Sequence, residues 1–163
     1  MKNEQKNPVR LASLLIVVGG LHGQVKAAAP RDACSLLSHA QVSAALGIEV
    51  DPGVRPVDTD PLACNWREHG KPTGLARNVI LYVYDAQKFE TGKTRVARTP
   101  SALQGGIGDD AYWFRPGRLP ITLTVKKGDS YFRLMARSDA AHPADDQDKA
   151  IDKALALDVL KHL

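Results

Sequence analysis

Apolar and polar residues alternate along two stretches of the chain, 119–126 and 130–136, and turn-forming residues separate them from each other and from a third strand-like stretch, 111–115. A period of two is typical of a β-strand that has one buried face and one wetter face. The pattern is clearest in the middle stretch, whose odd-numbered positions hold Leu119, Ile121, Leu123 and Val125. The three stretches therefore predict an antiparallel meander.

Two longer strands and one short one are predicted upstream of the meander. The segment 78–84 is apolar or aromatic on both faces, which indicates a central strand covered on both sides. The segment 62–67 is expected to form a strand anchored by the large apolar side chain of Trp66. Residues 48–50 could start a short strand.

The first predicted helix lies between Ser38 and Gly47, and both of its boundaries are marked. Ser38 and Gln41 have the spacing of a capping box, in which each side chain accepts a hydrogen bond from the other residue's backbone. Gly47 stands where a left-handed residue commonly ends a helix. These signals predict a short helix near the start of the domain.

A short helix after Asp85 and a longer one from Ala144 to the chain end complete the pattern. Gly92 weakens the second half of the short helix, and residues 95–104 are predicted to be a loop or a frayed helix. Acidic residues early in the C-terminal segment favour the positive end of a helix dipole. The order of elements predicts an α+β fold, an antiparallel β-sheet of about five to six strands with flanking N-terminal and C-terminal helices.

The first residues have the three zones of a secretory signal peptide. A basic start precedes an apolar run over 11–21, and a stretch of small residues follows. The run is about 11 residues, short of the ~20 that span a bilayer, so a cleaved leader is favoured over a retained anchor. We expect cleavage after Ala27, with Ala29 as the alternative site, and therefore a leader over 1–27 and a single domain over 28–163.

The charge of the chain changes once the leader is set aside. The whole sequence has 22 basic and 18 acidic residues, and the leader carries four of the basic ones and one acidic one. The remaining part has a net charge of about +1, so the alkaline isoelectric point of the chain belongs to targeting. We therefore expect no nucleic-acid partner and no stable membrane insertion after leader cleavage.

The two cysteines, Cys34 and Cys64, are predicted to form a disulfide because the chain is expected to be exported. The bond would close a loop of about 31 residues, for which chain entropy gives roughly 3.5–4 kcal/mol of stabilisation. A free redox-active thiol is the alternative, but the sequence has no Cys-x-x-Cys motif. The predicted location is periplasmic or secreted.

Candidate ligand-binding residues gather around one predicted hairpin. Trp113, Arg115 and Arg118 bring aromatic and basic side chains together, which could bind an anionic ligand. The alternative is a solvated sheet edge protected by charge and proline. Asp109 and Asp110 follow a glycine-rich segment just before the hairpin and complete the predicted binding set.

Other kinds of chemistry have little support in the sequence. The segment 105–112 fits one copy of a calcium-binding nonapeptide, but such sites take ligands from several stacked copies. His39, His69 and His142 lack the spacing of metal ligands, and the sequence has no Gly-x-Ser-x-Gly elbow. We predict no cofactor, no metal site and no catalytic residues.

A set of short motifs resembles a broad group of small exported bacterial domains of unknown function, which are similar to certain actinobacterial lipoproteins and to the extracellular sensor domains of some receptor kinases. The motifs are Cys34-x-Leu36-Leu37, Ala45-Leu46-Gly47, Cys64-x-Trp66 and Gly106-Ile107-Gly108-Asp109. The resemblance covers nearly all of the mature chain and implies a helix-flanked antiparallel sheet with a Cys34–Cys64 bridge. This chain has neither a lipobox nor a kinase, so anchoring and signalling are not implied. No catalytic residues come with the resemblance.

We expect an exported, non-enzymatic binding or sensor-like module of the bacterial envelope, whose partner is an unknown protein or small envelope ligand. The sheet face and the loops around Asp109 and Trp113 would form the site. One alternative is an inhibitor or immunity protein that blocks an exported enzyme through a loop such as 52–61. Another is a hydrolase that uses Asp109 or Asp110 with a histidine.

Overall fold

The computed structural model describes residues 32–57, 62–72, 74–97, 103–115 and 117–163. The predicted leader, residues 1–27, lies outside these ranges, and so do residues 58–61 of the loop 52–61. Within the described ranges, no helix combines the length and the apolar character needed to cross a membrane.

In the described part of the chain, five strands form one antiparallel sheet in the order β1-β2-β5-β4-β3. The strands are β1 (Ala63–Arg67), β2 (Asn78–Asp85), β3 (Asp110–Phe114), β4 (Thr122–Lys127) and β5 (Ser130–Arg137). The last three are consecutive neighbours, which confirms the predicted meander. The strand predicted over 78–84 is β2, which pairs with a strand on each side.

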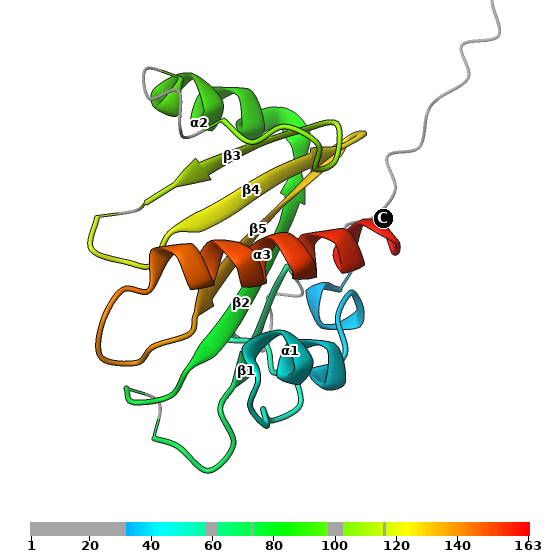
Figure 1. Ribbon diagram of the computed structural model, residues 1–163. Helices are drawn as coiled ribbons and strands as arrows, with labels where there is room; N and C mark the ends of the chain where they lie inside the picture. The colour runs from blue at the N-terminus through cyan, green and yellow to red at the C-terminus, as the bar shows by residue number, and fades with distance from the viewer. Residues whose placement is uncertain (1–31, 58–61, 73, 98–102, 116) are drawn as a thin grey trace, which may run out of the picture.

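Helices cover the two faces of this sheet unequally. α1 (His39–Leu46) and α3 (Asp145–Leu160) lie on one face, and α2 (Phe89–Val96) packs on the other. Figure 1 shows α3, in orange to red, crossing the sheet near α1, in cyan. The 3-10 turns η1 (Ala33–Ser35) and η2 (Ala86–Lys88) precede α1 and α2. The predicted α+β class is therefore confirmed; we call the face under α3 the first face and the opposite one the second face.

The boundaries of α1 are those that the sequence predicts. Ser38 Oγ accepts a hydrogen bond from the Gln41 backbone N–H at 3.2 Å, and Gln41 Oε1 accepts one from the Ser38 backbone N–H at 2.9 Å. Gly47 ends the helix with a φ of 66°, in the left-handed region that glycine adopts without strain. Local signals alone are sufficient to define this helix.

Two local predictions differ from the structure. Residues 48–50 form a single bridge, Val50 to Glu68, and not a strand. β4 begins at Thr122, after Pro120, which has no N–H to donate to a strand ladder. The uncertain second half of the predicted short helix is helical, because α2 continues through Gly92 to Val96.

Gly92 explains why α2 can pack on the second face. A Cβ atom at this position would lie 2.0 Å from the hydroxyl oxygen of Tyr112, so the glycine allows the helix to approach β3 closely. Phe89 and the rings of Tyr112 and Tyr131 form a small buried cluster at this contact. The residue that weakens the helix in isolation therefore permits its packing.

The main core lies between the first face and the helices α1 and α3. The strands contribute alternate residues, and α3 contributes Ile151, Leu155 and Val159 at helical spacing. From the sheet come Val79, Leu81, Val83, Ala111, Trp113, Leu123, Val125, Phe132, Leu134 and Ala136. Burial of these apolar side chains is the main source of stability for the domain.

Two carboxylates of α3 enter this core and bind the backbone of β5. Asp148 Oδ1 accepts hydrogen bonds from the Ser138 backbone N–H at 2.8 Å and from Ser138 Oγ at 2.6 Å, and Asp152 Oδ1 accepts one from the Ala136 backbone N–H at 2.9 Å. The pairing of β4 with β5 ends at Leu134, so these N–H groups lie beyond that ladder. The four-residue step from Asp148 to Asp152 rises about 6 Å along the helix, close to the ~6.8 Å between alternate strand residues, which explains the match.

The predicted disulfide is present. Cys34 and Cys64 are bonded with a Cα–Cα distance of 5.0 Å, which joins η1 to the edge strand β1. The carboxylate of Asp32 accepts a hydrogen bond from the Cys34 backbone N–H at 3.0 Å and forms an ion pair with Arg55. Disulfides persist in oxidising compartments, so this bond indicates a location outside the cytoplasm.

Candidate functional site

The residues predicted to bind a ligand lie at opposite ends of β3 and within it. Asp109 and Asp110 stand at the start of the strand, and Arg115 follows its last residue, Phe114. At ~3.4 Å per residue, Asp109 and Arg115 are separated by about 20 Å along the strand direction. The predicted set therefore does not form one cluster.

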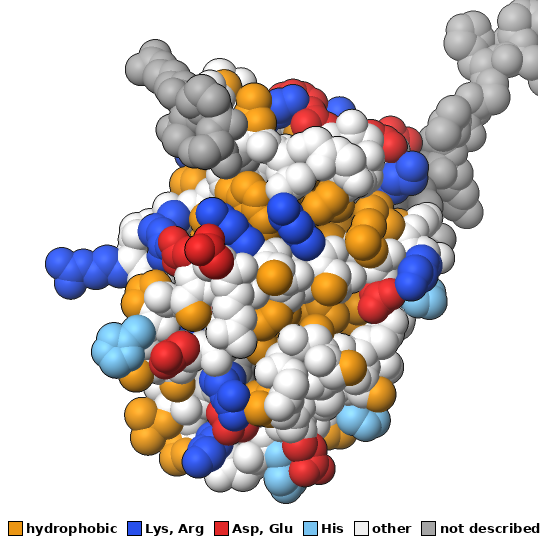
Figure 2. Space-filling view, viewed as in Figure 1, with side chains coloured by type: hydrophobic (Ala, Val, Ile, Leu, Met, Phe, Trp, Pro, Cys, Tyr) orange, Lys and Arg blue, Asp and Glu red, His pale blue; other side chains and the backbone are white. Residues whose placement is uncertain are grey.

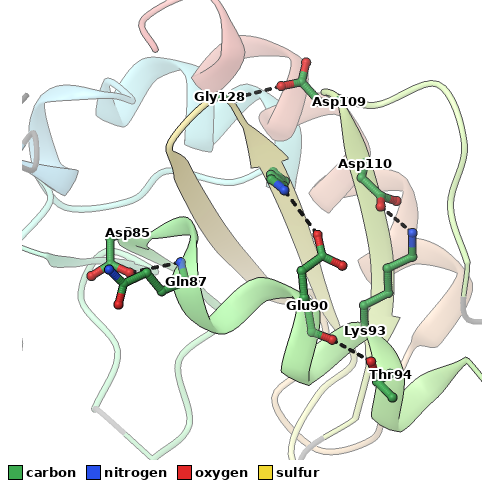
Figure 3. A network of polar contacts seen from close by, with 9 residues as sticks. Asp85, Gln87, Glu90, Lys93, Thr94, Asp109, Asp110 and Gly128 are labelled. Carbon is green, nitrogen blue, oxygen red and sulfur yellow. Dashed lines mark hydrogen bonds and ion pairs between the residues drawn. The ribbon is translucent and has the colours of Figure 1, made fainter. Parts of the chain in front are cut away.

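Asp109 and Asp110 each bind groups of the protein itself, as Figure 3 shows. Asp109 accepts hydrogen bonds from the Gly128 backbone N–H at 2.7 Å and from Lys127 Nζ at 3.0 Å, which ties the β4–β5 turn to the start of β3. These two donors, the Gly128 N–H first, hold the pKa of Asp109 below its usual value. Asp110 forms an ion pair with Lys93 of α2.

Trp113 belongs to the core. Its side chain is 5% exposed and faces α3, and its Nε1–H donates a hydrogen bond to Gln104 Oε1 at 3.3 Å. The ammonium of Lys149, on α3, lies 5.9 Å from the ring centroid. Burial on the first face leaves little of this ring for contact with a ligand.

Arg115 and Arg118 lie beyond the end of β3. Arg115 forms an ion pair with Asp145 at the start of α3 and donates a hydrogen bond to the Leu119 carbonyl at 2.9 Å. Arg118 is exposed and lines a small pocket near the start of α3. The other charged or titratable residues of that pocket are Arg137, Asp139, His142 and Asp148, so it carries both signs of charge.

The histidines do not gather around the two aspartates. In the described ranges no hydrogen bond joins Asp109 or Asp110 to a histidine. His69 Nδ1 lies 2.6 Å from Asp51 Oδ1 in an exposed pair, and this hydrogen bond raises the pKa of His69. Figure 2 shows histidine side chains around the margin of the first face. No group of three or more potential metal-ligating side chains occurs among the described residues.

A groove on the second face is lined by charged residues of one sign only, all of them lysine or arginine. It lies between α2 and the strands β2 and β5 and has a volume of about 530 Å³, within the range of small-molecule sites. The sheet supplies Tyr84, Tyr131 and Arg133, and the helical side supplies Lys88, Thr91, Gly92 and Arg95. We call this space the α2 groove.

The helical wall of the α2 groove follows from the sequence of this segment. The carboxylate of Asp85 accepts a hydrogen bond from the Gln87 backbone N–H at 3.1 Å and starts η2. Lys88 and Arg95 are seven residues apart, which is two turns and places them on the same side of a helix. Phe89 turns toward the sheet, with its ring centroid 5.2 Å from that of Tyr112. The aromatic contact holds the helix in place while the two cations face the groove.

Arg133 comes from the middle strand, β5, with Tyr82 and Thr124 as its cross-strand neighbours. Its guanidinium carbon lies 5.5 Å from the ring centroid of Tyr84 and 5.6 Å from that of Tyr131, and these rings stack at 5.0 Å. The buried Nε of Arg133 has no hydrogen-bond partner among the described residues. The two rings therefore orient a cation whose capacity for hydrogen bonds is not fully used by the protein.

The cations of the α2 groove differ from their neighbours in charge pairing. Within the described ranges, Lys88, Arg95 and Arg133 have no carboxylate partner, and no carboxylate lines the groove. By contrast, Lys93 pairs with Asp110, and Lys126 Nζ lies 3.1 Å from Glu90 Oε1; Figure 3 shows both contacts. Positive charge that the protein does not neutralise is thus concentrated in this groove.

Sequence reasoning included none of the residues that line the α2 groove. Two signals were present, the seven-residue spacing of Lys88 and Arg95 and the shared strand face of Tyr131 and Arg133. Neither signal brings the helix to β5, because β5 begins at Ser130, 34 residues after the end of α2 at Val96. The groove depends on strand order, which local patterns do not specify.

Comparison with known proteins finds no match for this chain among family models, curated proteins or solved structures. The resemblance to exported lipoproteins and sensor-type domains therefore stays a prediction. The geometry and charge of the α2 groove are the observations that bear on function.

Proposed function

We propose that the protein is an exported, non-enzymatic binding module that holds a small anionic ligand in the α2 groove. The observation that carries this proposal is that three cations, Lys88, Arg95 and Arg133, line one groove and that the described residues provide no carboxylate there. Like charges placed around one space repel each other, and a bound anion offsets that repulsion. A groove of this size accommodates a metabolite or part of an envelope component.

An extracytoplasmic setting supports the assignment to the envelope. The Cys34–Cys64 disulfide is typical of proteins in oxidising compartments. The three zones of residues 1–27 predict a cleaved secretory leader, with the periplasm or the surrounding medium as the destination. The ligand is accordingly expected among molecules of the envelope or the medium.

Binding is favoured over catalysis by the side chains of the groove. Its described lining has no histidine and no carboxylate, the groups that most often transfer protons near neutral pH. The aspartates of the alternative hydrolase, Asp109 and Asp110, are engaged by Lys127 and Lys93 on other parts of the surface. An arginine held between two rings, with a lysine and a second arginine across the groove, is better suited to holding an anion than to cleaving a bond.

The proposal is tested by an NMR titration of the ¹⁵N-labelled, disulfide-bonded protein with a panel of small sugars and organic acids, both neutral and anionic. We expect at least one anion to shift the backbone amides of residues 84–95 and 131–133. Binding that maps to residues 109–118 instead, or no binding across the panel, contradicts the proposal.

A matched pair of charge reversals makes the titration specific. Arg95→Glu places a negative charge in the groove and is expected to weaken binding about 10-fold or more. Lys153→Glu makes the same change at an exposed position of α3, on the first face, and is expected to leave binding unchanged. Equal loss in both variants would show that net charge alone governs binding.

A further inference from the structure

The three cations of the α2 groove, which have no carboxylate partner in the described part of the chain, approach one space from two walls. Arg133 rises from the middle of the sheet, and Lys88 and Arg95 come from the helical side. Resting on the binding function proposed above, we propose that the group recognised in the groove is the phosphomonoester of a small molecule. Arg133 binds its oxygens from the sheet side, and Lys88 and Arg95 neutralise it from the helix.

The guanidinium of Arg133 is suited to an oxyanion with several equivalent oxygens. Arginine offers donors in a planar fork, which pairs with two oxygens of a phosphate at once. Tyr84 and Tyr131 lie 5.5 Å and 5.6 Å from the guanidinium carbon and restrict its orientation before a ligand arrives. Less conformational freedom is then lost on binding.

The number of cations favours a doubly charged ligand group. A phosphomonoester carries about −1.5 to −2 charges near neutral pH, because its second pKa is about 6. A carboxylate carries one negative charge and would leave most of the positive charge of Lys88, Arg95 and Arg133 uncompensated. The charge balance of the groove therefore points to a dianion.

The helical wall has room for such a group between its two cations. Lys88 and Arg95 are about 10 Å apart along a helix with a rise of 1.5 Å per residue, and both have long flexible side chains. Thr91 and Gly92 lie between them in the lining, so a hydroxyl donor and a residue without a side chain face the same space. The two cations can therefore approach one phosphate from both sides.

The surrounding charges argue for a compact ligand and against a polyanion. Lys93 and Lys126, which flank the groove, are paired with Asp110 and Glu90. A nucleic acid or an anionic bilayer is bound through an extended basic surface, where many cations contribute. Among the described residues around the groove, the cations without a carboxylate partner are only Lys88, Arg95 and Arg133.

The test is isothermal titration of the full chain, with its disulfide intact, against three ligands that share one ring. They are glucose 1-phosphate, glucuronate and glucose, which carry a phosphomonoester, a carboxylate and no charge. We expect saturable binding of glucose 1-phosphate, at least about 10-fold tighter than glucuronate, and no binding of glucose. The affinity for glucose 1-phosphate should rise several-fold between about pH 5 and pH 7.5, as the phosphate loses its second proton.

Variants of the groove assign the contacts. Lys88 and Arg95 come from the helical wall of the groove. Lys88→Ala and Arg95→Ala are each expected to weaken binding of glucose 1-phosphate several-fold. Arg133→Lys keeps the charge but removes the planar fork, and about a 10-fold loss is expected. Lys153→Ala removes an exposed lysine of α3 and should change nothing.

Vesicle binding distinguishes two sources of a phosphomonoester, a lipid headgroup and a free small molecule. Phosphatidylcholine vesicles that contain phosphatidic acid present a phosphomonoester on a lipid, and binding to them in addition to glucose 1-phosphate would identify a lipid source. Binding of glucose 1-phosphate alone would identify a free phosphorylated molecule.

Two results overturn the inference and differ in their meaning. Equal or tighter binding of glucuronate or glucose, lost in the groove variants, rejects the phosphomonoester and leaves the proposed binding function in place. Absence of any binding to the phosphorylated probes, together with no binding in the wider NMR panel, rejects both.

Discussion

The two faces of the sheet use charged residues in opposite ways. On the first face, Asp148 and Asp152 are buried, and their carboxylates accept hydrogen bonds from the backbone of β5. On the second face, Lys88, Arg95 and Arg133 line an open groove without carboxylate partners among the described residues. The same central strand thus binds side-chain carboxyl groups on one side and, on the other, presents a cation without a carboxylate partner among the described residues.

This contrast separates stability from binding. A buried polar group is tolerated when hydrogen bonds replace its lost hydration, which is the situation of Asp148 with Ser138. Cations around a groove repel one another, so their mutual interaction does not stabilise the folded protein. We therefore expect changes on the first face to lower the free energy of unfolding and changes on the second face to affect ligand binding.

The largest effect is expected from the disulfide, which joins η1 to the first-face side of β1. Replacing Cys34 and Cys64 together by alanine should lower the free energy of unfolding by about 3.5–4 kcal/mol, because the unfolded chain gains freedom. Urea denaturation of the oxidised protein and the double variant measures this difference. Folded molecules of the variant should keep a normal α2 groove, and a loss of under ~1 kcal/mol would contradict a stabilising role.

The next effect concerns the first buried carboxylate. Asp148→Ala leaves the Ser138 backbone N–H and hydroxyl without their acceptor, which should cost about 2–3 kcal/mol of unfolding free energy. Asp146→Ala is the matched control, because Asp146 is exposed in the same first turn of α3 and should cost under ~1 kcal/mol. Similar losses in the two variants would show that the helix dipole, and not the buried contact, accounts for the effect.

Asp152 makes stability depend on pH. Burial, with a smaller contribution from the nearby charge of Asp148, raises the pKa of Asp152 well above its ordinary value of 3.8. The folded protein then keeps a proton that the unfolded chain has lost, so the free energy of unfolding falls as pH rises from about 4 toward the raised pKa. The slope from this group is at most about 1.4 kcal/mol per pH unit.

Asp152→Asn removes this titration, and the difference in unfolding free energy between the two proteins measures it across a pH series. The carboxylates with lowered pKa values, among them Asp109 and Glu68, lose their contribution as pH falls, but they are common to both proteins and cancel. A difference that stays constant with pH would contradict the raised pKa of Asp152.

The smallest effects on stability are expected on the second face. Lys88→Ala and Arg95→Ala should each change the free energy of unfolding by under ~0.5 kcal/mol, because neither residue has a carboxylate partner among the described residues. Lys93→Ala, on the same helix, removes the ion pair with Asp110 and should cost up to ~1 kcal/mol. Thermal or urea denaturation compares them, and larger losses at Lys88 or Arg95 would assign these cations a structural role.

Features that depend on neighbouring residues could be predicted from the sequence. The capping box of α1, the meander of β3, β4 and β5, and the single disulfide each follow from short spacings or from the presence of just two cysteines. The core position of Trp113, on the same side as Ala111, could not be predicted in this way, because residues 111–114 are apolar or aromatic on both faces.

The α2 groove could not be predicted in the same way. Tyr84 and Tyr131 stack because β2 and β5 are adjacent strands, and no local signal specifies that pairing. The close approach of α2 depends on Gly92 meeting the hydroxyl of Tyr112, a contact between separate elements. Gly92 signals a weak helix when it is considered alone, because helix propensity describes an isolated segment.

The strand order also has a consequence for the timing of folding. β5 is the last strand in the sequence, yet it occupies the middle of the sheet, between β2 and β4. A chain that emerges N-terminus first therefore presents β2 with an unpaired edge until residues 130–137 follow. The contacts of α3 with β5 form later still, so the main core is complete only when almost the whole chain has emerged.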